Sequence, residues 1–261
     1  MNLNQLAEVL GTAKHLAVKA SKVILDIYLK DFAIDYKEDT SPLTEADRKS
    51  NELIVAALKN KYPECAILAE ESTDDPKRLN NDWCFIIDPL DGTKEFIKKN
   101  GEFTINIALA HKGKAVLGVV YIPVAGDMYY AVKGMGAFYE ANGKSERIFV
   151  SSRTEDIRMV KSRSHTSGKL DELIKKHDIK NIRIAGSAIK GCLIAKGEAE
   201  IYYRFGYTME WDTAAMQCII EEAGGIFRQM DDSEMTYNRP NTLNEKGFYA
   251  INDYKNKLEI P

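Results

Sequence analysis

The stretch "WCFIIDPLDGTKEF", residues 83–96, joins an apolar run to two aspartates. Its first five residues are apolar and predict a buried strand, after which Asp88 and Asp91 follow at a spacing of three. Gly92 and Thr93 come directly after the second aspartate. An aspartate that follows a strand often caps a turn or a helix, and Asp-Gly is a favourable turn pair. Alone, the segment therefore allows either a structural turn or two functional carboxylates.

Further acids elsewhere in the chain favour the functional interpretation. Glu70 and Glu71 follow the apolar "AILA", Asp47 stands near a predicted helix start in "TEAD", and Asp212 lies in "EWDTAA", just before another predicted helix. Clustered carboxylates repel one another, and their pKa values rise unless a cation neutralises them. An oxygen-only set without His or Cys favours a hard ion, usually Mg²⁺. Two such ions roughly 3.5–4 Å apart can clamp a phosphoryl group for in-line displacement.

The residues after Asp91 fit phosphate chemistry. Gly92 allows close approach, and the amides of Gly92 and Thr93 at a helix start can bind a phosphate oxygen, while the Thr93 hydroxyl can orient a water. Haloacid-dehalogenase-type phosphatases also carry a DxDGT motif, but their nucleophile position is Pro89 here, which cannot attack. An EF-hand loop is excluded because its glycine comes five residues after the first aspartate, not four. The spacing favours attack by water assisted by metal.

Composition is that of an ordinary globular protein. The 261 residues are 44% hydrophobic and 29% charged, with a net charge of −3, which does not suggest a surface for duplex nucleic acid. No apolar run approaches the roughly 18 residues of a membrane-spanning helix, and the N-terminus does not resemble a signal peptide. Four scattered cysteines without a CxxC motif predict reduced thiols in a cytoplasmic protein. Oligomeric state and peripheral membrane association are left open.

The periodicity of apolar residues predicts an α/β fold, with helices layered between two sheets. Helical spacing covers residues 3–29, and a second helix begins at Thr44, where Asp47 completes a capping box. Residues 103–150 read as antiparallel hairpins, and helices and strands alternate after residue 151. We expect an N-terminal half (1–150), a C-terminal half (151–261) and a cleft between them.

Taken together, "DPLDGTKEF" and the distant "EWDTAA" resemble the paired signatures of the inositol monophosphatase superfamily, which comprises lithium-sensitive, Mg²⁺-dependent phosphatases. Within it, Leu90 and the "KEF" of residues 94–96 are most similar to the bacterial 3′(2′),5′-bisphosphate nucleotidases of the CysQ type. The segments "SRSH", "GSAIK" and "YYRF" also resemble nucleotidase segments. The resemblance implies an inositol-monophosphatase-like fold and covers nearly the whole chain.

The resemblance implies a role for individual residues. Two or three Mg²⁺ ions would be bound mostly by the N-terminal half, through Glu70, Asp88, the backbone carbonyl of Leu90, Asp91 and, from the C-terminal half, Asp212. Asp47 and Thr93 would activate water. Substrate contacts would come from Gly92, Thr93, His165, Ser187, Lys190, Arg204 and Asp212.

Several of these residues also have plain structural interpretations. A lone histidine such as His165 is usually a surface residue, and a lysine such as Lys190 on a helix is usually solvated. Arg204 ends an apolar strand, where an unpaired charge would be costly, so an anionic partner is expected there without the resemblance. Glu71 is the rival of Glu70 as metal ligand, and sequence physics does not decide between them.

Three positions depart from the family pattern. Met216 follows "WDTAA" where glycine is usual, Glu200 stands where aspartate is common, and Gly191-Cys192 replaces a bulkier pair. None of them is an inferred ligand, although Met216 could narrow the packing behind Asp212.

The resemblance predicts an enzyme that hydrolyses the 3′-phosphate of adenosine 3′,5′-bisphosphate (PAP), a by-product of sulfate activation and sulfotransfer, to AMP and phosphate. Three alternatives stay open: an inositol-phosphate or other sugar-phosphate phosphatase, a hydrolase of short oligonucleotides, and a non-catalytic metal or nucleotide sensor. The sensor is the weakest of these, because every inferred ligand and the water-activating pair are present.

Overall fold

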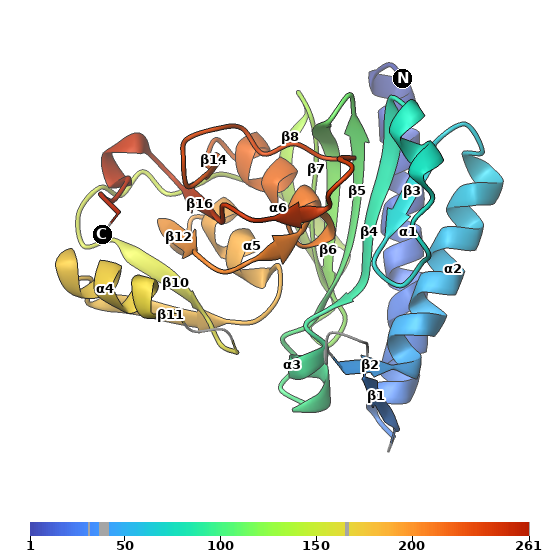
Figure 1. The fold of residues 1–261 in the computed structure, drawn as a ribbon, viewed down its shortest axis with the longest axis horizontal. Helices are drawn as coiled ribbons and strands as arrows, with labels where there is room; N and C mark the ends of the chain where they lie inside the picture. The colour runs from blue at the N-terminus through green and yellow to red at the C-terminus, as the bar shows by residue number, and fades with distance from the viewer. Residues whose placement is uncertain (31, 37–41, 165–166, 261) are drawn as a thin grey trace.

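The computed structural model describes residues 1–30, 32–36, 42–164 and 167–260. The protein's helices and sheets alternate in layers along its long axis (Figure 1). The helical segments are α1 (Leu3–Tyr28), α2 (Glu45–Lys61), α3 (Thr93–Ile97), α4 (Gly168–Lys176), α5 (Ile189–Ala195) and α6 (Glu210–Glu222), with 3₁₀ turns η1 (Pro76–Asn80) and η2 (Tyr254–Asn256).

A seven-stranded sheet forms the centre of the N-terminal half. Its first pair of strands is parallel, and every later pair is antiparallel, so the predicted run of hairpins is confirmed. Gly126 and Gly143 have positive φ in two of the connecting turns. In spatial order the strands are β3 (Ala66–Ala69), β4 (Trp83–Asp91), β5 (Thr104–His111), β6 (Lys114–Ile122), β7 (Asp127–Val132), β8 (Gly136–Ala141) and β9 (Lys144–Ile148).

A five-stranded mixed sheet forms the centre of the C-terminal half. Its spatial order is β11 (Asn181–Ala185), β10 (Arg158–Ser162), β12 (Ile201–Arg204), β16 (Phe248–Ile251) and β14 (Ile226–Gln229). Two short antiparallel pairs complete the strands of the described residues: β1 (Ile34–Tyr36) with β2 (Pro42–Thr44), and β13 (Thr208–Met209) with β15 (Leu243–Asn244).

The central strands β4 and β5 are buried along nearly their whole length, and their successive side chains point to opposite faces, so both faces of the seven-stranded sheet are covered there. α1 and α2 pack together on the outer face of the seven-stranded sheet, and α6 packs on its inner face over β4 to β7 (Figure 1). α5 lies beside α6 between the two sheets, and α4 packs on the far face of the five-stranded sheet through Leu170 and Leu173. The result is a five-layer α/β sandwich, which confirms the predicted fold class.

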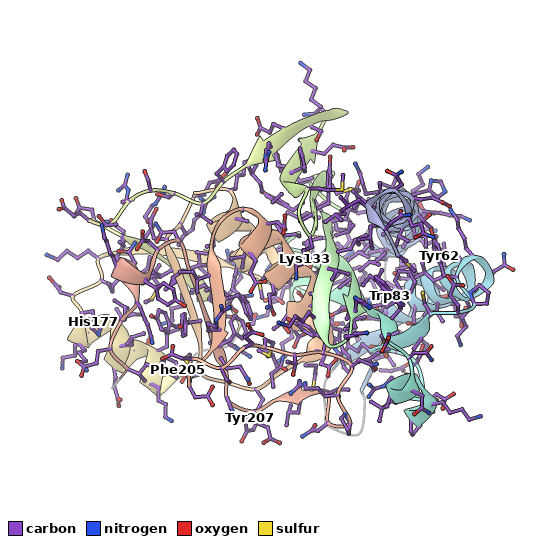
Figure 2. All side chains as sticks on the ribbon, turned by 90° about the horizontal axis from the view of Figure 1, so that it is seen from above. Tyr62, Trp83, Lys133, His177, Phe205 and Tyr207 are labelled. Carbon is purple, nitrogen blue, oxygen red and sulfur yellow. The ribbon has the colours of Figure 1, made fainter. Side chains whose placement is uncertain are left out.

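The two long N-terminal helices begin where their sequences predict. Asn2 caps α1 and exchanges hydrogen bonds with Gln5. Thr44 caps α2, and the side chain of Asp47 accepts from the Thr44 backbone N–H at 2.8 Å, which is the predicted capping box. Figure 2 shows Tyr62, just after α2, and Trp83, at the start of β4, at the end of the molecule opposite Phe205 and His177. No helix among the described residues is both long and apolar enough to span a membrane.

The core between the sheets belongs to both halves of the chain. It joins Ile86 and Val120 of the N-terminal sheet to Ile219 and Phe248 of the C-terminal half. α6 approaches β6 so closely that a Cβ at Gly118 would overlap the backbone carbonyl of Ala215. The cleft between the halves is therefore framed by elements that a shared core holds together.

Met216 and Gly191, two of the positions that depart from the family pattern, contact each other. Met216 in α6 is buried, and a Cβ at position 191 in α5 would overlap its Cγ and Sδ atoms. The large residue on one helix thus fills the space that the small residue on the other leaves free. The third departure, Glu200, is fully buried and pairs with Arg158 at 2.5 Å.

We predict that Gly191→Ala destabilises the protein by about 1–3 kcal/mol, because overpacking forces α5 and α6 apart. Met216→Ala should cost about 2–5 kcal/mol through the cavity that it leaves. In the double variant the two changes should compensate in part, since the new methyl group occupies space that the methionine has vacated. Urea unfolding of the four proteins measures the coupling, and strictly additive losses would contradict a size exchange.

Gly11→Ala is the matched control for this series. Gly11 also lies within a helix, but a Cβ there would meet nothing within 4 Å. Alanine should therefore stabilise the protein by about 0.5–1 kcal/mol through helix propensity alone.

Candidate active site

The strand β4 continues past the apolar run of residues 83–87 and finishes at Asp91. Ile86 faces the core beside α6, so Asp88, two residues later, points to the same side. Residues three apart on a regular strand would point to opposite faces. Here a β-bulge intervenes. Asp88 pairs with Asn106 and Asp91 pairs with Thr104, so β4 advances by three residues while β5 advances by two. The bulge returns Asp91 to the face of Asp88.

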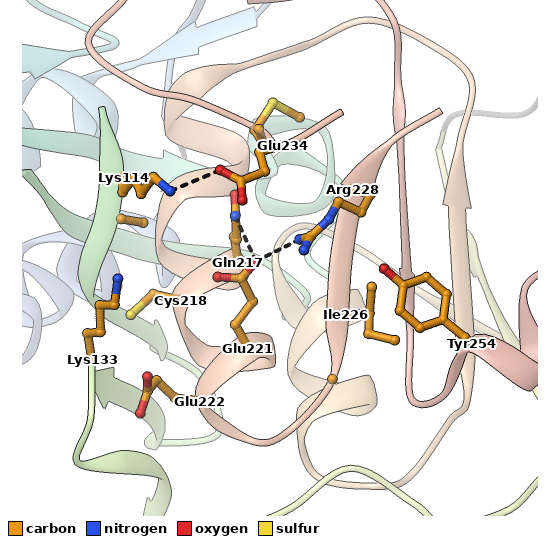
Figure 3. A pocket seen from close by; sticks show the side chains of 13 residues that line it. Lys114, Lys133, Gln217, Cys218, Glu221, Glu222, Ile226, Arg228, Glu234 and Tyr254 are labelled. Atoms are coloured by element: carbon orange, nitrogen blue, oxygen red, sulfur yellow. Dashed lines mark hydrogen bonds and ion pairs between the residues drawn. The ribbon is translucent and has the colours of Figure 1, made fainter. Parts of the chain in front are cut away.

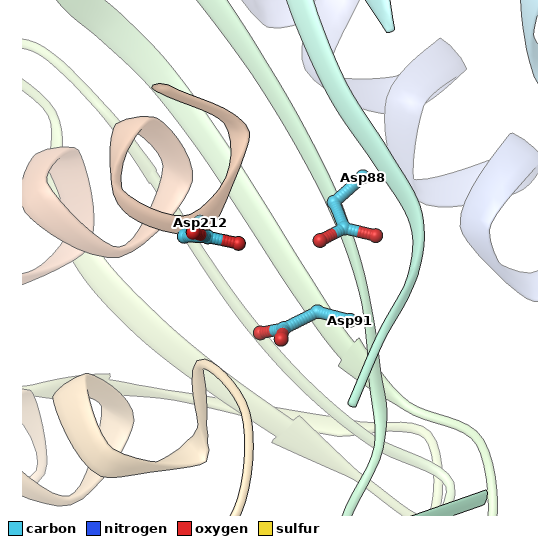
Figure 4. A group of neighbouring side chains, drawn as sticks. All are labelled: Asp88, Asp91 and Asp212. Carbon is cyan, nitrogen blue, oxygen red and sulfur yellow. The ribbon is translucent and has the colours of Figure 1, made fainter. Parts of the chain in front are cut away.

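The third carboxylate comes from α6. The sequence predicted Asp212 just before this helix. The helix instead begins at Glu210, so Asp212 lies within its first turn. Its Oδ2 accepts a hydrogen bond from the backbone N–H of Met209 at 2.6 Å, which fixes the side chain at the helix terminus. Asp88, Asp91 and Asp212 each offer an oxygen, and these oxygens lie within 4.8 Å of one another (Figure 4).

Burial and mutual repulsion favour the protonated forms of these acids. The pKa of Asp88 is raised well above its ordinary value by burial and by the charges of Glu70, Asp91 and Asp212. Burial and the Asp91 charge raise the pKa of Asp212 to about 7. The pKa of Asp91 is raised by burial, although Lys190 opposes the shift. A divalent cation would relieve this repulsion, and an oxygen-only donor set suits Mg²⁺.

Two more of the predicted ligands border the same space. Glu70 lines the cavity, and its charge raises the pKa of Asp88, whereas its neighbour Glu71 is not among the lining residues, which favours Glu70 as the ligand. Leu90 also lines the cavity, but its side chain is buried in the core under α1 and α2. What Leu90 offers the cavity is thus its backbone.

The turn after β4 places Thr93 beside Asp47. Gly92 has φ +96° before the first residue of α3, and a Cβ there would lie 3.3 Å from the Glu102 carbonyl and from Ser187 Cβ. Thr93 Oγ1 donates to Asp47 Oδ1 at 3.1 Å, while the other Asp47 oxygen caps α2. Burial raises the pKa of Asp47. Asp47 therefore orients the Thr93 hydroxyl, whose oxygen can accept a proton at the edge of the carboxylate cluster.

A cavity of about 330 Å³ contains the carboxylate cluster and is lined by residues of both halves of the chain. Its lining includes Asp88, Asp91 and Asp212, called here the carboxylate wall, and Lys190 and Arg204, called here the cationic wall. A site with acids on one side and cations on the other can bind a metal ion and an anionic ligand together.

Lys190 is buried, with 7% of its surface exposed, so the expectation of a solvated lysine is wrong. Its Nζ donates to the Ser187 carbonyl at 2.5 Å. Burial lowers its pKa, and the nearby charge of Asp91 opposes that shift. A buried ammonium group that faces the cavity can bind an anion strongly, because the anion offsets the cost of burying the positive charge.

Two other donors at this wall have no hydrogen-bond partner among the described residues. They are Ser187 Oγ and Arg204 Nε, both buried. Ser187 also holds φ +42°, a conformation that non-glycine residues rarely adopt. Buried donors without partners are costly, so a ligand with acceptor oxygens is the natural partner for them.

The cavity brings together most of the predicted site residues. Asp47 contacts it through Thr93, and His165 lies outside the described residues. Sequence reasoning missed Thr104 and Asn106, which both donate to Asp91 Oδ2 at 3.3 Å. The available signal was two polar residues at alternate positions of the otherwise apolar strand "TINIALA". It also missed the aromatic lining residues Tyr202, Tyr207, Trp211 and Phe248.

A second cavity, of about 360 Å³, lies at the opposite end of α6 (Figure 3). Its lining mixes charges that already pair with one another: Lys114 with Glu234 at 3.0 Å, and Arg228 with Glu221 at 3.4 Å. Glu222 accepts from the backbone N–H groups of Gly134 and Gly136. Among the described residues, a carboxylate cluster that could hold a metal ion is found only in the first cavity.

Comparison with known proteins agrees with this geometry. The model of the inositol monophosphatase family matches residues 5–259. The 3′(2′),5′-bisphosphate nucleotidase CysQ of Salmonella typhimurium is 40% identical over 238 residues, which cover 89% of this chain and 95% of that protein. The protein of the same name from Escherichia coli K12 is 38% identical over the same shares.

Solved structures show the same fold. CysQ from Bacteroides thetaiotaomicron is 40% identical with a TM-score of 0.80, covering 91% of this chain and 94% of the other. The extragenic suppressor protein suhB from Bartonella henselae is 27% identical, also with a TM-score of 0.80, covering 95% of both chains.

We predict that Asp91→Asn has opposite effects on stability with and without Mg²⁺. Without the ion, the variant should be more stable than the native chain by about 1 kcal/mol, or a Tm about 2–4 °C higher, because one of three repelling carboxylates is gone. With millimolar Mg²⁺, the native Tm should rise and that of the variant much less, since binding stabilises the folded state. Thermal unfolding across a Mg²⁺ series measures both effects.

Asp82→Asn is the control, because Asp82 is an exposed acid near the start of β4. It should follow the native Mg²⁺ response. An equal Mg²⁺ response in native protein and Asp91→Asn would rule out this cluster as the cation site.

Proposed function

The chain belongs to the inositol monophosphatase family, and we propose that it is a Mg²⁺-dependent 3′(2′),5′-bisphosphate nucleotidase that hydrolyses the 3′-phosphate of PAP. One observation carries the choice of substrate: in the cavity that holds the carboxylate cluster, the buried donor atoms Ser187 Oγ and Arg204 Nε have no hydrogen-bond partner among the described residues. A single phosphate at the carboxylates would leave these donors unpaired, whereas a second phosphate and a ribose would supply acceptors. The names of the CysQ relatives support the same substrate class.

The carboxylates and the cations that line the cavity would bind different parts of the reacting complex. On the N-terminal side, Asp88, Asp91 and Glu70, the Leu90 carbonyl and, from α6, Asp212 would hold two or three Mg²⁺ ions beside the 3′-phosphate. On the C-terminal side, Lys190 and Arg204 would bind the 5′-phosphate, which is not cleaved. The division into residues 1–150 and 151–261 is part of this proposal.

Thr93 and Asp47 would activate the attacking water. Thr93 Oγ1 donates its own hydrogen to Asp47 Oδ1, so its lone pairs are free to accept a proton from water in the cavity. As the water gives its proton to Thr93 Oγ1, the hydrogen of Thr93 passes to Asp47. The water oxygen attacks phosphorus in line, the bond to the ribose 3′-oxygen breaks, and that oxygen takes a proton from solvent to become the hydroxyl of AMP. The amides of Gly92 and Thr93 would support the phosphate, and bound Mg²⁺ would supply Lewis-acid stabilisation of its charge.

A substrate panel tests the proposal directly. We expect PAP to have the highest kcat/KM with Mg²⁺, above PAPS, inositol 1-phosphate, fructose 1,6-bisphosphate and short RNA. A preference for inositol 1-phosphate would replace it with a sugar-phosphate phosphatase, which the likeness to suhB structures would accommodate. A cytoplasmic location is also part of the proposal, and the four free, buried cysteines are in keeping with a reducing compartment.

Thr93→Ala and Asp47→Asn should each lower kcat by roughly 10²–10⁴, because each removes one member of a proton-accepting pair. Since the two residues act as a unit, the double variant should be no slower than the slower single variant. Thr93→Ser keeps the hydroxyl and should retain most activity. Steady-state kinetics on PAP decides, and fully multiplicative losses would mean separate roles.

Lys190→Met and Arg204→Met should weaken PAP hydrolysis and spare a small monophosphate. A charge-assisted contact contributes about 1.5–3 kcal/mol, so kcat/KM for PAP should fall roughly ten- to over a hundredfold. Inositol 1-phosphate has no second phosphate for these cations, so its kcat/KM should change by less than about twofold. Methionine keeps the apolar volume of the buried lysine stem and limits damage to packing.

Lys180→Met serves as the control for charge alone, because Lys180 lies in the same half but is highly exposed. Parallel loss of both activities in the Lys190 and Arg204 variants would count against a dedicated 5′-phosphate site.

A further inference from the structure

Two carboxylates of the N-terminal half reach across to the C-terminal half beside the cavity. Glu102, just before β5, accepts from Arg163 Nε and from its second guanidinium nitrogen, both at 2.7 Å. Glu102 Oε2 also accepts from the backbone N–H of Gly186 at 2.8 Å. Glu95 in α3 accepts from Ser164 Oγ at 2.5 Å. Glu102 therefore contacts two separate segments of the C-terminal half at once.

The backbones meet closely at this point. A Cβ at Gly186 would lie 2.6 Å from the Glu102 carbonyl oxygen and 2.8 Å from Glu95 Cγ. Only glycine at position 186 lets the N–H approach the Glu102 carboxylate without displacing one half from the other.

The segments that Glu102 contacts lead directly into the substrate wall. Ser187 follows Gly186, and its carbonyl accepts from Lys190 Nζ. Ser162, next to Arg163, lines the cavity. Holding the Gly186 N–H and the Arg163 guanidinium therefore restrains the groups that face the carboxylate cluster.

The chain just after Glu102 also contacts the carboxylate cluster. Two residues after Glu102, Thr104 begins β5, and Thr104 and Asn106 both donate to Asp91. Residues 102–106 thus connect one metal-binding carboxylate to the backbone that carries Ser187 and Lys190.

We propose that Glu102 is a positioning residue that sets the distance between the metal-binding wall and the wall that binds the second phosphate. This inference rests on the proposed nucleotidase function and adds to it a determinant of specificity for bisphosphates. Because the side chains of Arg163 and Glu102 are 40% and 26% exposed, their ion pair should add little to folding stability. Its effect should appear in substrate binding instead.

Kinetics of Glu102→Ala, Glu102→Gln and Arg163→Ala on PAP test the proposal. Glu102→Ala should raise KM about tenfold, the effect of ~1.4 kcal/mol, with kcat within about twofold and little change in Tm. Glu102→Gln keeps an acceptor for the Gly186 N–H but loses the charge, so its KM should be intermediate. The double variant Glu102→Ala/Arg163→Ala should match Glu102→Ala, because the two side chains form one contact.

Arg183→Ala is the matched control. Arg183 forms a similar 2.7 Å pair with Glu198, but both residues belong to the C-terminal half. Its KM should equal that of the native enzyme.

The outcomes separate the two proposals. Native enzyme that fails to prefer PAP overturns the nucleotidase function and this inference with it. Native enzyme that prefers PAP, combined with an unchanged KM in Glu102→Ala, overturns the positioning role alone. A joint fall of kcat and Tm without a rise in KM would also overturn it, since that pattern reflects general structural damage.

Discussion

The β-bulge between Asp88 and Asp91 is the constraint on which the rest of the site depends. Without it, two aspartates three residues apart on a strand would face opposite layers, one toward α6 and one toward the core under α1 and α2. With it, both carboxylates point toward the terminus of α6, where Asp212 completes the cluster. The bulge also ends β4 in the turn that starts α3, so Thr93 lies beside Asp47. One irregular pairing thus places the three aspartates and the Thr93–Asp47 pair around one cavity.

Concentrating buried carboxylates has an energetic cost that the surroundings offset only in part. Thr104 and Asn106 donate to Asp91, and the Lys190 charge favours its ionised form. The pKa of Asp88 nevertheless stays well above its ordinary value. Ser187 Oγ and Arg204 Nε show the opposite deficit, since they are buried donors with no acceptor in the part of the chain that the structure describes. Under the proposed function, the stability given up on both walls would be recovered when cations and an anionic substrate bind together, which would link folding energetics to function.

Local sequence patterns predicted the main helices and strands and drew attention to the acids that gather at the cavity, whereas the roles of individual residues came from the family resemblance. Caps, apolar periodicity and turn glycines predicted the helices and hairpins, and the "DPLDGT" and "EWDTAA" segments identified the acids. Features that depend on pairing between distant segments were not predictable. The bulge requires the register of β4 against β5, and the burial of Lys190 requires the packing of α5 between two sheets. The fit of Met216 against Gly191 and the contact of Glu102 with Gly186 likewise join residues far apart in the chain.

The central claim is that one cavity binds cations on the carboxylate wall and the second phosphate on the cationic wall. A crystal structure of the protein with Mn²⁺, AMP and phosphate, with anomalous data that locate the manganese, tests it most directly. The account predicts manganese coordinated by Asp88, Asp91 and Asp212, inorganic phosphate beside it, and the 5′-phosphate of AMP within hydrogen-bond distance of Lys190 and Arg204. Manganese bound away from these aspartates, or a 5′-phosphate away from both cations, would contradict it.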